Sequence, residues 1–203
     1  MSRPVIAVDI DDVLSASAEG FAAYSNKRWG LNITPDDYLE DWATVWGVPH
    51  DIAEERAKEI HRVGVIAKYR CFGEAKPILA DLKQRYDLQA VTSRRIVIKP
   101  ETDVWLEKHF PGIFSKTIYA GFWDEIGPDF NKRLSATKAE ICRSIGARYL
   151  IDDQIKHCEG AAEHGIEAIL FGDYSWNRGK EISPGIIRAS NWGAIQEHFY
   201  AKS

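Results

Sequence analysis

Short apolar runs alternate with segments of helical periodicity along most of the chain. Such runs, rich in Val, Ile and Leu, are typical of strands buried on both faces of a parallel sheet. The runs that fit this description are residues 5–8, 88–91, 117–120, 149–151 and 168–171. The segments with apolar positions three or four residues apart are 77–86, 100–110, 135–145 and 155–164. This alternation predicts an α/β fold, in which helices cover both faces of a parallel sheet.

The connection between the first two strands is much longer than one crossover helix requires. About sixty residues precede the helix that leads into the second strand, whereas most connections in compact domains are far shorter. We therefore expect a small helical cap at residues 15–73, inserted into a core made of residues 1–14 and 74–203.

The inserted segment contains its own helix signals. Thr34 followed by Pro35 is typical of a helix N-terminus, with the proline at the first helical position. Asp51 and Glu54 have the spacing of a capping box and predict the start of a further helix.

The composition is that of an ordinary globular protein. Apolar residues make up 45% and charged residues 28%, and 26 basic against 30 acidic residues give a net charge of −4. No basic run is present, so the chain is a poor candidate for binding a nucleic-acid polymer or a membrane surface. No apolar run approaches the roughly 18 residues of a membrane span, and the N-terminus does not resemble a signal peptide.

The cysteines indicate a reducing environment. Cys71, Cys142 and Cys158 are odd in number, far apart and without metal-ligand spacing. We expect a cytoplasmic protein with buried, reduced thiols. The sequence does not determine its oligomeric state.

Polar residues follow three of the five predicted strands. Asp9 and Asp11 follow the first, Thr92 and Ser93 end the second, and Asp152 and Asp153 follow the fourth. Each pair alone is also typical of an ordinary turn. Because ligands bind outside the carboxyl ends of the strands in an open parallel sheet, we expect all of them at one functional edge.

Four carboxylates at one edge would repel one another unless a cation lay among them. Oxygen ligands in this number suit Mg²⁺, which commonly also binds substrate phosphate. Thr92 could then contribute a hydroxyl to a phosphate beside the metal, and Lys138 a positive charge. Lys138 lies in the first turn of its predicted helix, where a positive charge opposes the helix dipole.

These residues resemble the four motifs of the haloacid-dehalogenase-like phosphatases, in the same order along the chain. The matching segments are residues 9–14, 91–93, Lys138 and 150–153. Nearly the whole chain is covered, and the insertion lies where that superfamily carries its cap. The expected fold is a Rossmann-like parallel sheet of strand order 3-2-1-4-5. Within the superfamily, segments 92–94, 105–110, 173–177 and 191–192 are similar to those of the 5′(3′)-deoxyribonucleotidases, the cytosolic type C 5′-nucleotidases.

The resemblance implies an Mg²⁺-dependent phosphomonoester hydrolase that acts on (deoxy)nucleoside monophosphates or another small phosphometabolite. Asp9 is expected to attack phosphorus and form an aspartyl-phosphate, while Asp11 acts as general acid and base. The remaining expected roles are phosphate binding by Thr92, Ser93, Arg94 and Lys138, and metal binding by the Asp9 carboxylate, the Asp11 carbonyl, Asp152 and Asp153.

The sequence departs from the family pattern at two positions. Asp12 replaces the usual glycine of the first motif, and aspartate tolerates the left-handed backbone conformation of a tight turn. Ser17 stands where better-known members carry an aromatic residue that packs on the nucleobase, which leaves the nucleotide preference open. Most cap aromatics are expected to form a small core, with one or two facing the substrate. These aromatics are Phe21, Tyr24, Trp29, Tyr38, Trp42 and Trp46.

Two other functional classes remain as alternatives. A receiver-like phosphoacceptor domain also uses acids, a hydroxyl and a lysine at strand ends. Its acceptor aspartate ends a mid-chain strand, however, where this chain has Gly121. An inactive binding module with the same fold is the second alternative. Hydrolysis of an aryl phosphate with and without Mg²⁺ would distinguish both from an enzyme.

Overall fold

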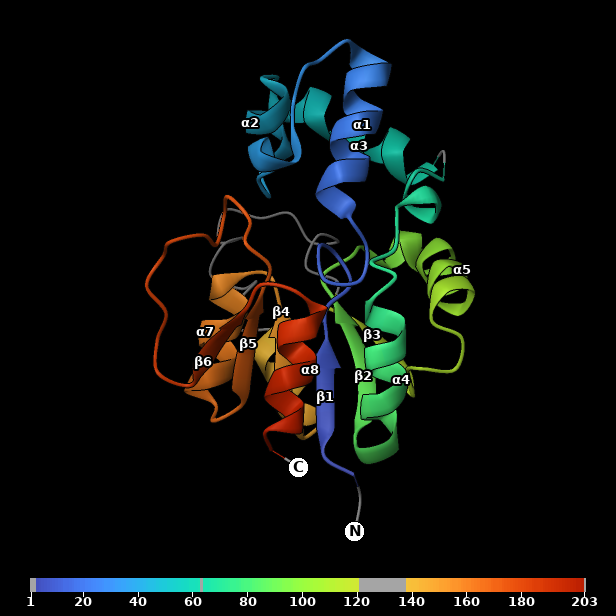
Figure 1. Ribbon diagram of the computed structural model, residues 1–203. Helices are drawn as coiled ribbons and strands as arrows, with labels where there is room; N and C mark the ends of the chain where they lie inside the picture. Colours follow the sequence, from blue (N-terminus) through green and yellow to red (C-terminus); the bar gives the residue numbers. More distant parts are fainter. Residues whose placement is uncertain (1–2, 63, 121–137, 203) are drawn as a thin grey trace.

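The computed structural model describes residues 3–62, 64–120 and 138–202. Six parallel strands form one sheet in the order β3-β2-β1-β4-β5-β6 (Figure 1). The strands are β1 (Val5–Val8), β2 (Asp87–Thr92), β3 (Lys116–Tyr119), β4 (Ala147–Asp152), β5 (Glu167–Phe171) and β6 (Ile186–Ala189). The predicted α/β fold and the order 3-2-1-4-5 are confirmed.

The sixth strand was not predicted from the sequence. β6 is four residues long, lies at the sheet edge, and includes Arg188, so it lacks the apolar run that marks the central strands. It forms because its residues pair in parallel with β5, from Ala168 opposite Ile186 to Phe171 opposite Ala189.

Alternate residues of β1 supply the two faces of the sheet. Ile6 and Val8 pack into a cluster with apolar residues of three helices on one face, whereas Ala7 packs into a second cluster on the other. The helices on the first face are α4 (Ala75–Arg85), α5 (Lys99–His109) and α8 (Trp192–Tyr200). α7 (Ile155–Glu163) and the helical residues 138–144 cover the second face.

Four helices were predicted in the core, and three lie within the described residues. The segments 77–86, 100–110 and 155–164 correspond to α4, α5 and α7, with ends that differ by at most two residues. The fourth predicted helix, 135–145, begins outside the described residues, and residues 138–144 are helical.

The inserted segment between β1 and α4 is helical, as expected. Its elements are α1 (Ser17–Trp29), a 3-10 turn η1 (Pro35–Asp37), α2 (Trp42–Trp46), α3 (His50–Arg62) and a 3-10 turn η2 (Ile66–Lys68). Thr34 caps η1, where its hydroxyl and backbone N–H both contact Asp37. The predicted capping box at Asp51 is wrong: α3 begins at His50, so Asp51 lies within its first turn, where an acid favours the helix dipole.

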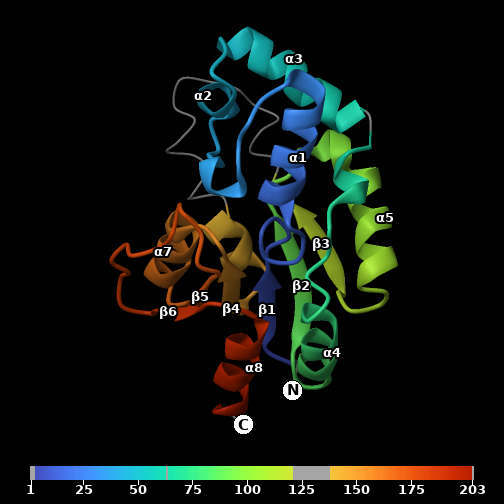
Figure 2. The ribbon, with the colours of Figure 1, turned by 45° about the horizontal axis from the view of Figure 1, so that its top comes forward.

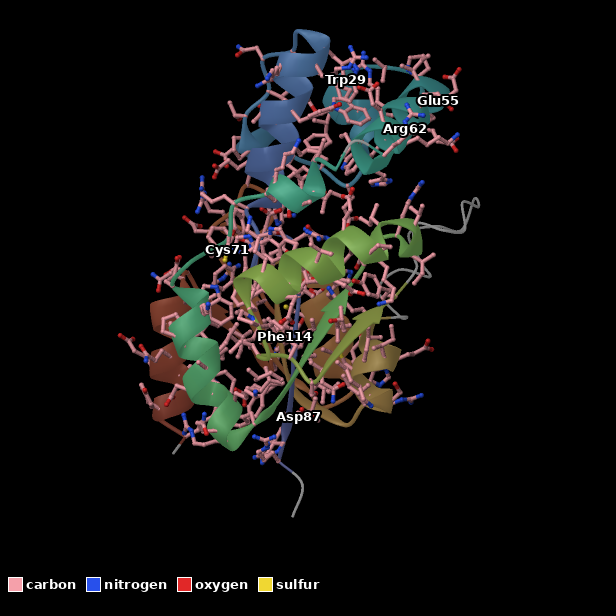
Figure 3. The ribbon with its side chains drawn as sticks, turned by 90° about the vertical axis from the view of Figure 1, so that its right-hand side faces the viewer. Trp29, Glu55, Arg62, Cys71, Asp87 and Phe114 are labelled. Carbon is pink, nitrogen blue, oxygen red and sulfur yellow. The ribbon has the colours of Figure 1, made fainter. Side chains whose placement is uncertain are left out.

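The inserted helices lie over the carboxyl ends of the strands (Figures 1 and 2). The two connecting segments run side by side: the Ala16 N–H donates to the Arg70 carbonyl at 2.8 Å, and the Phe72 N–H to the Leu14 carbonyl at 2.9 Å. Figure 3 shows Cys71 at this junction, with Trp29 and Arg62 on the side of the inserted helices. We keep the name proposed cap for residues 15–73, and that division of the chain stays a prediction.

The proposed cap has an apolar cluster of its own. Phe21, Trp46 and Ile60 are buried there, and core residue Ile98 completes the cluster from below. Among the described residues, no helix is both long and apolar enough to cross a membrane.

Candidate active site

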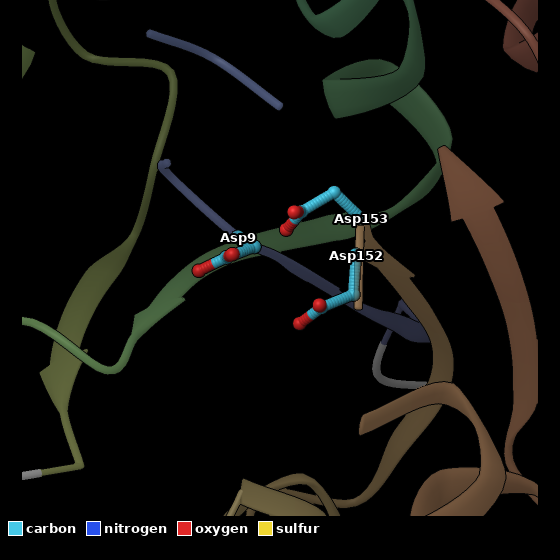
Figure 4. Close-up of side chains that lie close together, drawn as sticks. All are labelled: Asp9, Asp152 and Asp153. Carbon is cyan, nitrogen blue, oxygen red and sulfur yellow. The ribbon is translucent and has the colours of Figure 1, made fainter. Parts of the chain in front are cut away.

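The register of the sheet brings the first and fourth motifs together. Val8 of β1 lies opposite Ile151 of β4, so Asp9 and Asp152 follow at the same level of the sheet edge. One carboxylate oxygen each from Asp9, Asp152 and Asp153 lies within 4.8 Å of the others, and all three side chains are buried. Figure 4 shows the three carboxyl groups pointing to the same side.

Lys138 joins two of these carboxylates. Its Nζ lies 2.8 Å from Asp9 Oδ1 and 2.6 Å from Asp152 Oδ2, and the side chain is completely buried. Burial lowers the pKa of Lys138, but the charges of Asp152 and Asp9 raise it by more, so the ammonium form is retained. Lys138 therefore fixes the orientation of the Asp9 carboxylate.

One lysine does not balance three carboxyl groups. Burial raises the pKa of Asp9 above its usual value, and the charges of Asp152 and Asp11 add to this effect although Lys138 opposes it. Burial and the charges of Asp152 and Asp9 also raise the pKa of Asp153 well above its usual value. An all-oxygen, buried group with excess negative charge is the donor set that suits a hard divalent cation such as Mg²⁺.

The second aspartate of the first motif faces a different partner. Arg94 donates two hydrogen bonds to the Asp11 carboxylate. Its Nε lies 2.9 Å from Oδ2, and its Nη2 lies 2.7 Å from Oδ1. Burial alone would raise the pKa of Asp11, but the charge and hydrogen bonds of Arg94, with a contribution from Ser17, bring it below its usual value. Asp11 is therefore ionised at neutral pH in this arrangement.

The remaining donors of Arg94 are directed to hydroxyl groups. Nη1 donates to Thr102 Oγ1 at 3.1 Å and Nη2 to Ser15 Oγ at 3.2 Å, and the guanidinium is almost fully buried. Ser17 lies 2.6 Å from Ser15 and donates to Asp11. The structure thus gives the predicted phosphate-binding Arg94 a set of contacts within the protein, centred on Asp11.

Thr92 and Ser93 lie at the end of β2, but their hydroxyl groups differ in environment. Thr92 Oγ1 accepts the Arg94 backbone N–H at 3.1 Å, so it shapes the turn. Ser93 lines the cavity described below, and its buried Oγ has no hydrogen-bond partner among the described residues. An unpaired buried hydroxyl at this position is available to a ligand oxygen.

A cavity of about 750 Å³ lies between the aspartate cluster and the inserted helices. Asp9, Asp11 and Asp153 lie at its floor together with Ser93. Its upper wall includes four aromatic side chains, those of Phe21, Tyr38, Trp42 and Tyr69. Three of the six cap aromatics named in the sequence analysis, Phe21, Tyr38 and Trp42, thus line the cavity. Trp46 instead packs inside the proposed cap, in contact with Trp29 and Phe21.

His157, which the sequence analysis did not single out, contacts the site. Its Nδ1 lies 3.1 Å from Asp152 Oδ1, on the opposite side of that carboxyl group from Lys138. Burial lowers the pKa of His157 by more than the charge of Asp152 raises it, so a neutral imidazole donates through Nδ1. The only sequence signal was its position one turn after the fourth motif, at the start of α7.

The segment 173–177 after β5 also reaches the aspartate cluster. Trp176 Nε1 donates to Asp153 Oδ2 at 2.7 Å, and Asn177 Nδ2 donates to the Asp153 carbonyl at 2.9 Å. In the sequence, this segment was noted only for its similarity to the 5′(3′)-deoxyribonucleotidases. Its position after a parallel strand was the signal that could have placed it at the same edge.

Comparison with known proteins assigns a family. Residues 3–203 match the family described as 5′ nucleotidase, deoxy (Pyrimidine), cytosolic type C protein. No curated protein matches the chain significantly.

Solved structures share the fold at low sequence identity. A haloacid dehalogenase-like hydrolase from Streptococcus pneumoniae is 14% identical, with a TM-score of 0.69 over 97% of this chain and 98% of that one. A putative phosphatase from Clostridium difficile is 17% identical, with a TM-score of 0.69 over 98% and 99%. A putative hydrolase of the same superfamily from Bacillus subtilis, described as bound to magnesium, is 12% identical, with a TM-score of 0.62 over 98% and 99%.

These structures agree with the topology of the sheet, and the family match extends over almost the entire chain. The chain therefore belongs to the cytosolic type C 5′-nucleotidase family of haloacid-dehalogenase-like hydrolases, and is a phosphomonoester hydrolase of the phosphatase and nucleotidase class.

Proposed function

We propose that this hydrolase is Mg²⁺-dependent, acts through an aspartyl-phosphate on Asp9, and uses (deoxy)nucleoside monophosphates as substrates. The observation that carries the proposal is the position of Asp9: its carboxylate is held by Lys138 within the aspartate cluster and faces a cavity large enough for a nucleotide. The family description, which names a deoxynucleotidase, supports the substrate class.

In the first half of the reaction, an Asp9 oxygen attacks phosphorus and the bond from phosphorus to the ester oxygen breaks. Asp11 gives a proton to the departing oxygen, so the products are an alcohol and the aspartyl-phosphate. Because Arg94 favours the ionised form of Asp11, an incoming phosphate must help Asp11 to carry that proton, which its negative charge does by raising the pKa of the neighbouring carboxyl group.

In the second half, water attacks the phosphorus of the aspartyl-phosphate while Asp11 removes its proton. The bond from phosphorus to the Asp9 oxygen breaks, releasing inorganic phosphate and restoring the Asp9 carboxylate. The lowered pKa of Asp11 favours this half directly, since the carboxylate is the form that accepts a proton. Lys138 and Ser93, with Thr92 and Arg94 as further predicted contacts, would bind the phosphoryl oxygens.

The residues that would hold Mg²⁺ are Asp9, Asp153, the backbone carbonyl of Asp11 and, behind them, Asp152. The charge balance of the cluster fits a divalent ion, because three buried carboxyl groups face one lysine. A bound Mg²⁺ supplies positive charge that offsets the repulsion between the Asp9 carboxylate and the phosphate. Asp152 contacts both Lys138 and His157, so its main contribution would be to hold Lys138.

The cavity wall supports a substrate with a flat, apolar body. Ser17 cannot stack on a base, because its side chain is small and its hydroxyl is bound to Asp11. Phe21 lies one turn further along α1, and Tyr38 and Trp42 supply aromatic surface beside it. We propose that these rings replace the missing aromatic at position 17 as the contact for a nucleobase.

We also propose that residues 15–73 act as the substrate-selecting cap and, from the family description, that the protein is cytoplasmic.

Asp9→Asn tests the nucleophile. The amide is nearly isosteric and can still accept from Lys138, so the fold should persist while the rate of p-nitrophenyl phosphate hydrolysis falls by at least about a thousandfold, or ~4 kcal/mol in the barrier. Asp81→Asn, on the exposed surface of α4, is the matched control and should leave the rate unchanged. Activity of the Asp9 variant within about tenfold of the wild type would exclude Asp9 as the nucleophile.

Two further measurements test the cofactor and the substrate. Excess chelator should abolish hydrolysis, and added Mg²⁺ should restore it.

Among nucleoside monophosphates, sugar phosphates and other small phosphoesters, deoxynucleoside monophosphates should have the highest kcat/KM. A preference for sugar phosphates over every nucleotide would overturn the substrate assignment and leave the phosphatase assignment intact. No hydrolysis of any phosphoester would favour an inactive binding module.

A further inference from the structure

The segment 173–177, which we call the β5 loop, contacts the aspartate cluster at two neighbouring points. The Trp176 indole N–H donates to Asp153 Oδ2 at 2.7 Å, beside the Gln154 amide, which donates to the same oxygen at 2.9 Å. Asn177 Nδ2 donates both to the Asp153 carbonyl at 2.9 Å and to the Phe171 carbonyl at 3.0 Å. The loop therefore restrains both the backbone and the carboxylate of Asp153.

The Trp176 ring is itself held in place by the core. It stacks on Tyr174 with ring centroids 4.6 Å apart and planes 8° from parallel. The Tyr174 hydroxyl donates to the Asp12 carbonyl at 2.6 Å. Gly172, at a φ of +80°, makes this arrangement possible, because a Cβ there would lie 2.1 Å from the Tyr174 ring. The indole thus packs on Tyr174, which is itself hydrogen-bonded to the backbone of the first motif.

The proposed cap touches the same loop from above. The Tyr38 ring contacts Trp176 edge to face, with centroids 5.6 Å apart and an interplanar angle of 62°. Ser175 Oγ donates to the Asp36 carbonyl at 2.7 Å, and Glu40 forms an ion pair with Lys156 of α7. Residues 36–40 of the cap are thereby joined to the β5 loop and to the start of α7.

We propose that Trp176 is a positioning residue that couples the cap to the cation site: Tyr38 packs on the indole, and the indole N–H holds the Asp153 carboxylate in the orientation that binds the metal. The proposal rests on the proposed function, in which Asp153 is a ligand. Groups that orient a metal ligand in this way change metal affinity by about 10–100-fold when removed.

The coupling has a physical basis on both sides of the indole. Asp153 lies among other carboxyl groups and is repelled by Asp9 and Asp152, so it needs donors that keep it directed toward the site. When the cap lies in place, the Tyr38 ring restrains the indole and hence the donor. By linkage, a cap position that strengthens metal binding is itself favoured by bound metal.

The test is Trp176→Phe, which keeps a ring for Tyr174 and Tyr38 and removes the N–H donor. Mn²⁺ binding to the substrate-free protein, followed by electron paramagnetic resonance or calorimetry, should weaken about tenfold. Trp29→Phe makes the same chemical change in the proposed cap outside the cavity wall, where it packs on Tyr24 and Trp46. That control should bind Mn²⁺ like the wild type, and thermal unfolding should show that both variants are folded.

A double-mutant cycle separates coupling from local damage. Tyr38→Leu should also weaken Mn²⁺ binding. The Tyr38→Leu/Trp176→Phe double variant should bind Mn²⁺ no more weakly than Trp176→Phe alone, because the indole N–H through which Tyr38 acts is already missing. Additive losses would overturn the coupling between cap and metal. Mn²⁺ affinity of Trp176→Phe within about twofold of the wild type, or no Mn²⁺ binding by the wild type, would overturn the role of Trp176.

The readout does not depend on catalysis, so the two proposals fail separately. Weakened Mn²⁺ binding in a protein that hydrolyses no phosphoester would support the inference and overturn the proposed function. Unchanged Mn²⁺ binding in a Mg²⁺-dependent phosphatase would do the reverse.

Discussion

Asp12 occupies a backbone conformation that few residues tolerate. Its φ is +55°, and it is the only non-glycine residue with a positive φ in the described part of the chain. Its side-chain oxygen Oδ1 accepts the Ala18 N–H at 3.0 Å, near the start of α1. The aspartate thus makes the turn that the family usually makes with glycine, and it also satisfies a helix N-terminus.

Comparing two replacements of Asp12 isolates the contribution of its positive φ. Asp12→Gly and Asp12→Ala both remove the acceptor for Ala18, but only the alanine variant keeps a Cβ at positive φ. We expect Asp12→Ala to be less stable than Asp12→Gly by about 1 kcal/mol in urea unfolding without metal. Equal stabilities would mean that the turn relaxes to another conformation.

Arg94 and Asp11 form the other residue-level feature that distinguishes this site. Arg94→Met leaves the Asp11 carboxylate without its bidentate partner. Loss of one partner of a fully buried pair costs about 3–5 kcal/mol, but the Asp11 side chain is 35% exposed, so we expect a loss of about 2 kcal/mol in the free energy of unfolding. Arg28→Met, which removes the solvent-exposed partner of Glu59, should lower the free energy of unfolding much less than Arg94→Met does, because solvent screens an exposed pair.

A second substitution checks the origin of the Arg94 effect. In Arg94→Met/Asp11→Asn the unpaired charge is gone, so part of the lost stability should return. If the double variant is as unstable as the sum of the two single variants, the loss reflects packing around Thr102 and Ser15 and not the charge pair.

At the level of elements, close packing of α1 against the end of η2 depends on one glycine. A Cβ on Gly20 would lie 2.3 Å from the Tyr69 ring. Tyr69 is buried, and its carbonyl accepts the Trp105 indole N–H at 2.9 Å, so the ring cannot move freely. Gly20 therefore fixes how near the cap helix can approach the segment that leads back to the core.

Helix propensity and packing make opposite predictions for Gly20→Ala. Alanine is favoured over glycine by about 1 kcal/mol within a helix. The overlap with Tyr69 should outweigh this gain, and we expect a net destabilisation of about 1–2 kcal/mol in urea unfolding. Ala23→Gly, at an exposed position of the same helix, measures the propensity term alone and should cost about 1 kcal/mol. A stabilised Gly20→Ala variant would show that α1 can shift away from Tyr69.

For the whole molecule, the buried carboxyl groups link stability to pH and to metal. Burial raises the pKa of Asp12 to about 8, and Asp9 and Asp153 are also raised. In the unfolded chain these groups titrate near pH 3.9, so between about pH 4 and pH 8 the folded protein binds more protons than the unfolded chain. Stability of the metal-free protein should therefore fall as pH rises through this window.

Calorimetry in chelator should show a Tm that decreases from about pH 5.5 to about pH 8. Mg²⁺ should raise the Tm, and more strongly at the higher pH, because metal and protons compete for the same carboxylates. At a Mg²⁺ concentration one hundred times its Kd, binding should raise the free energy of unfolding by about 2.7 kcal/mol. A metal-free Tm that increases with pH across the window would contradict the raised pKa values of the buried carboxyl groups. A Tm that does not change when Mg²⁺ is added would contradict the cation site.

The sequence determined the sheet and the place of the chemistry. The apolar runs predicted five of the six strands, because burial on both faces requires near-continuous Val, Ile and Leu, and the resemblance to the haloacid-dehalogenase-like phosphatases supplied their order. Asp9, Asp152 and Asp153 could be placed at one edge because parallel strands all end there, and the structure brings their carboxyl groups within 4.8 Å. Hydrophobic periodicity and strand ends are local features, so they can be recognised without knowing the fold.

Only the tertiary structure decided the partners of those residues. Arg94 contacts Asp11 across 83 positions of sequence, and Ser175 contacts the Asp36 carbonyl across 139. The strand β6 and the approach of Trp176 to Asp153 likewise depend on how elements pack, since β6 lacks an apolar run and the family similarity of segment 173–177 does not identify its partner. Local pattern fixes which residues form an element, but contacts between distant side chains follow from the register of the sheet and the position of the inserted helices, and these are properties of the packed molecule.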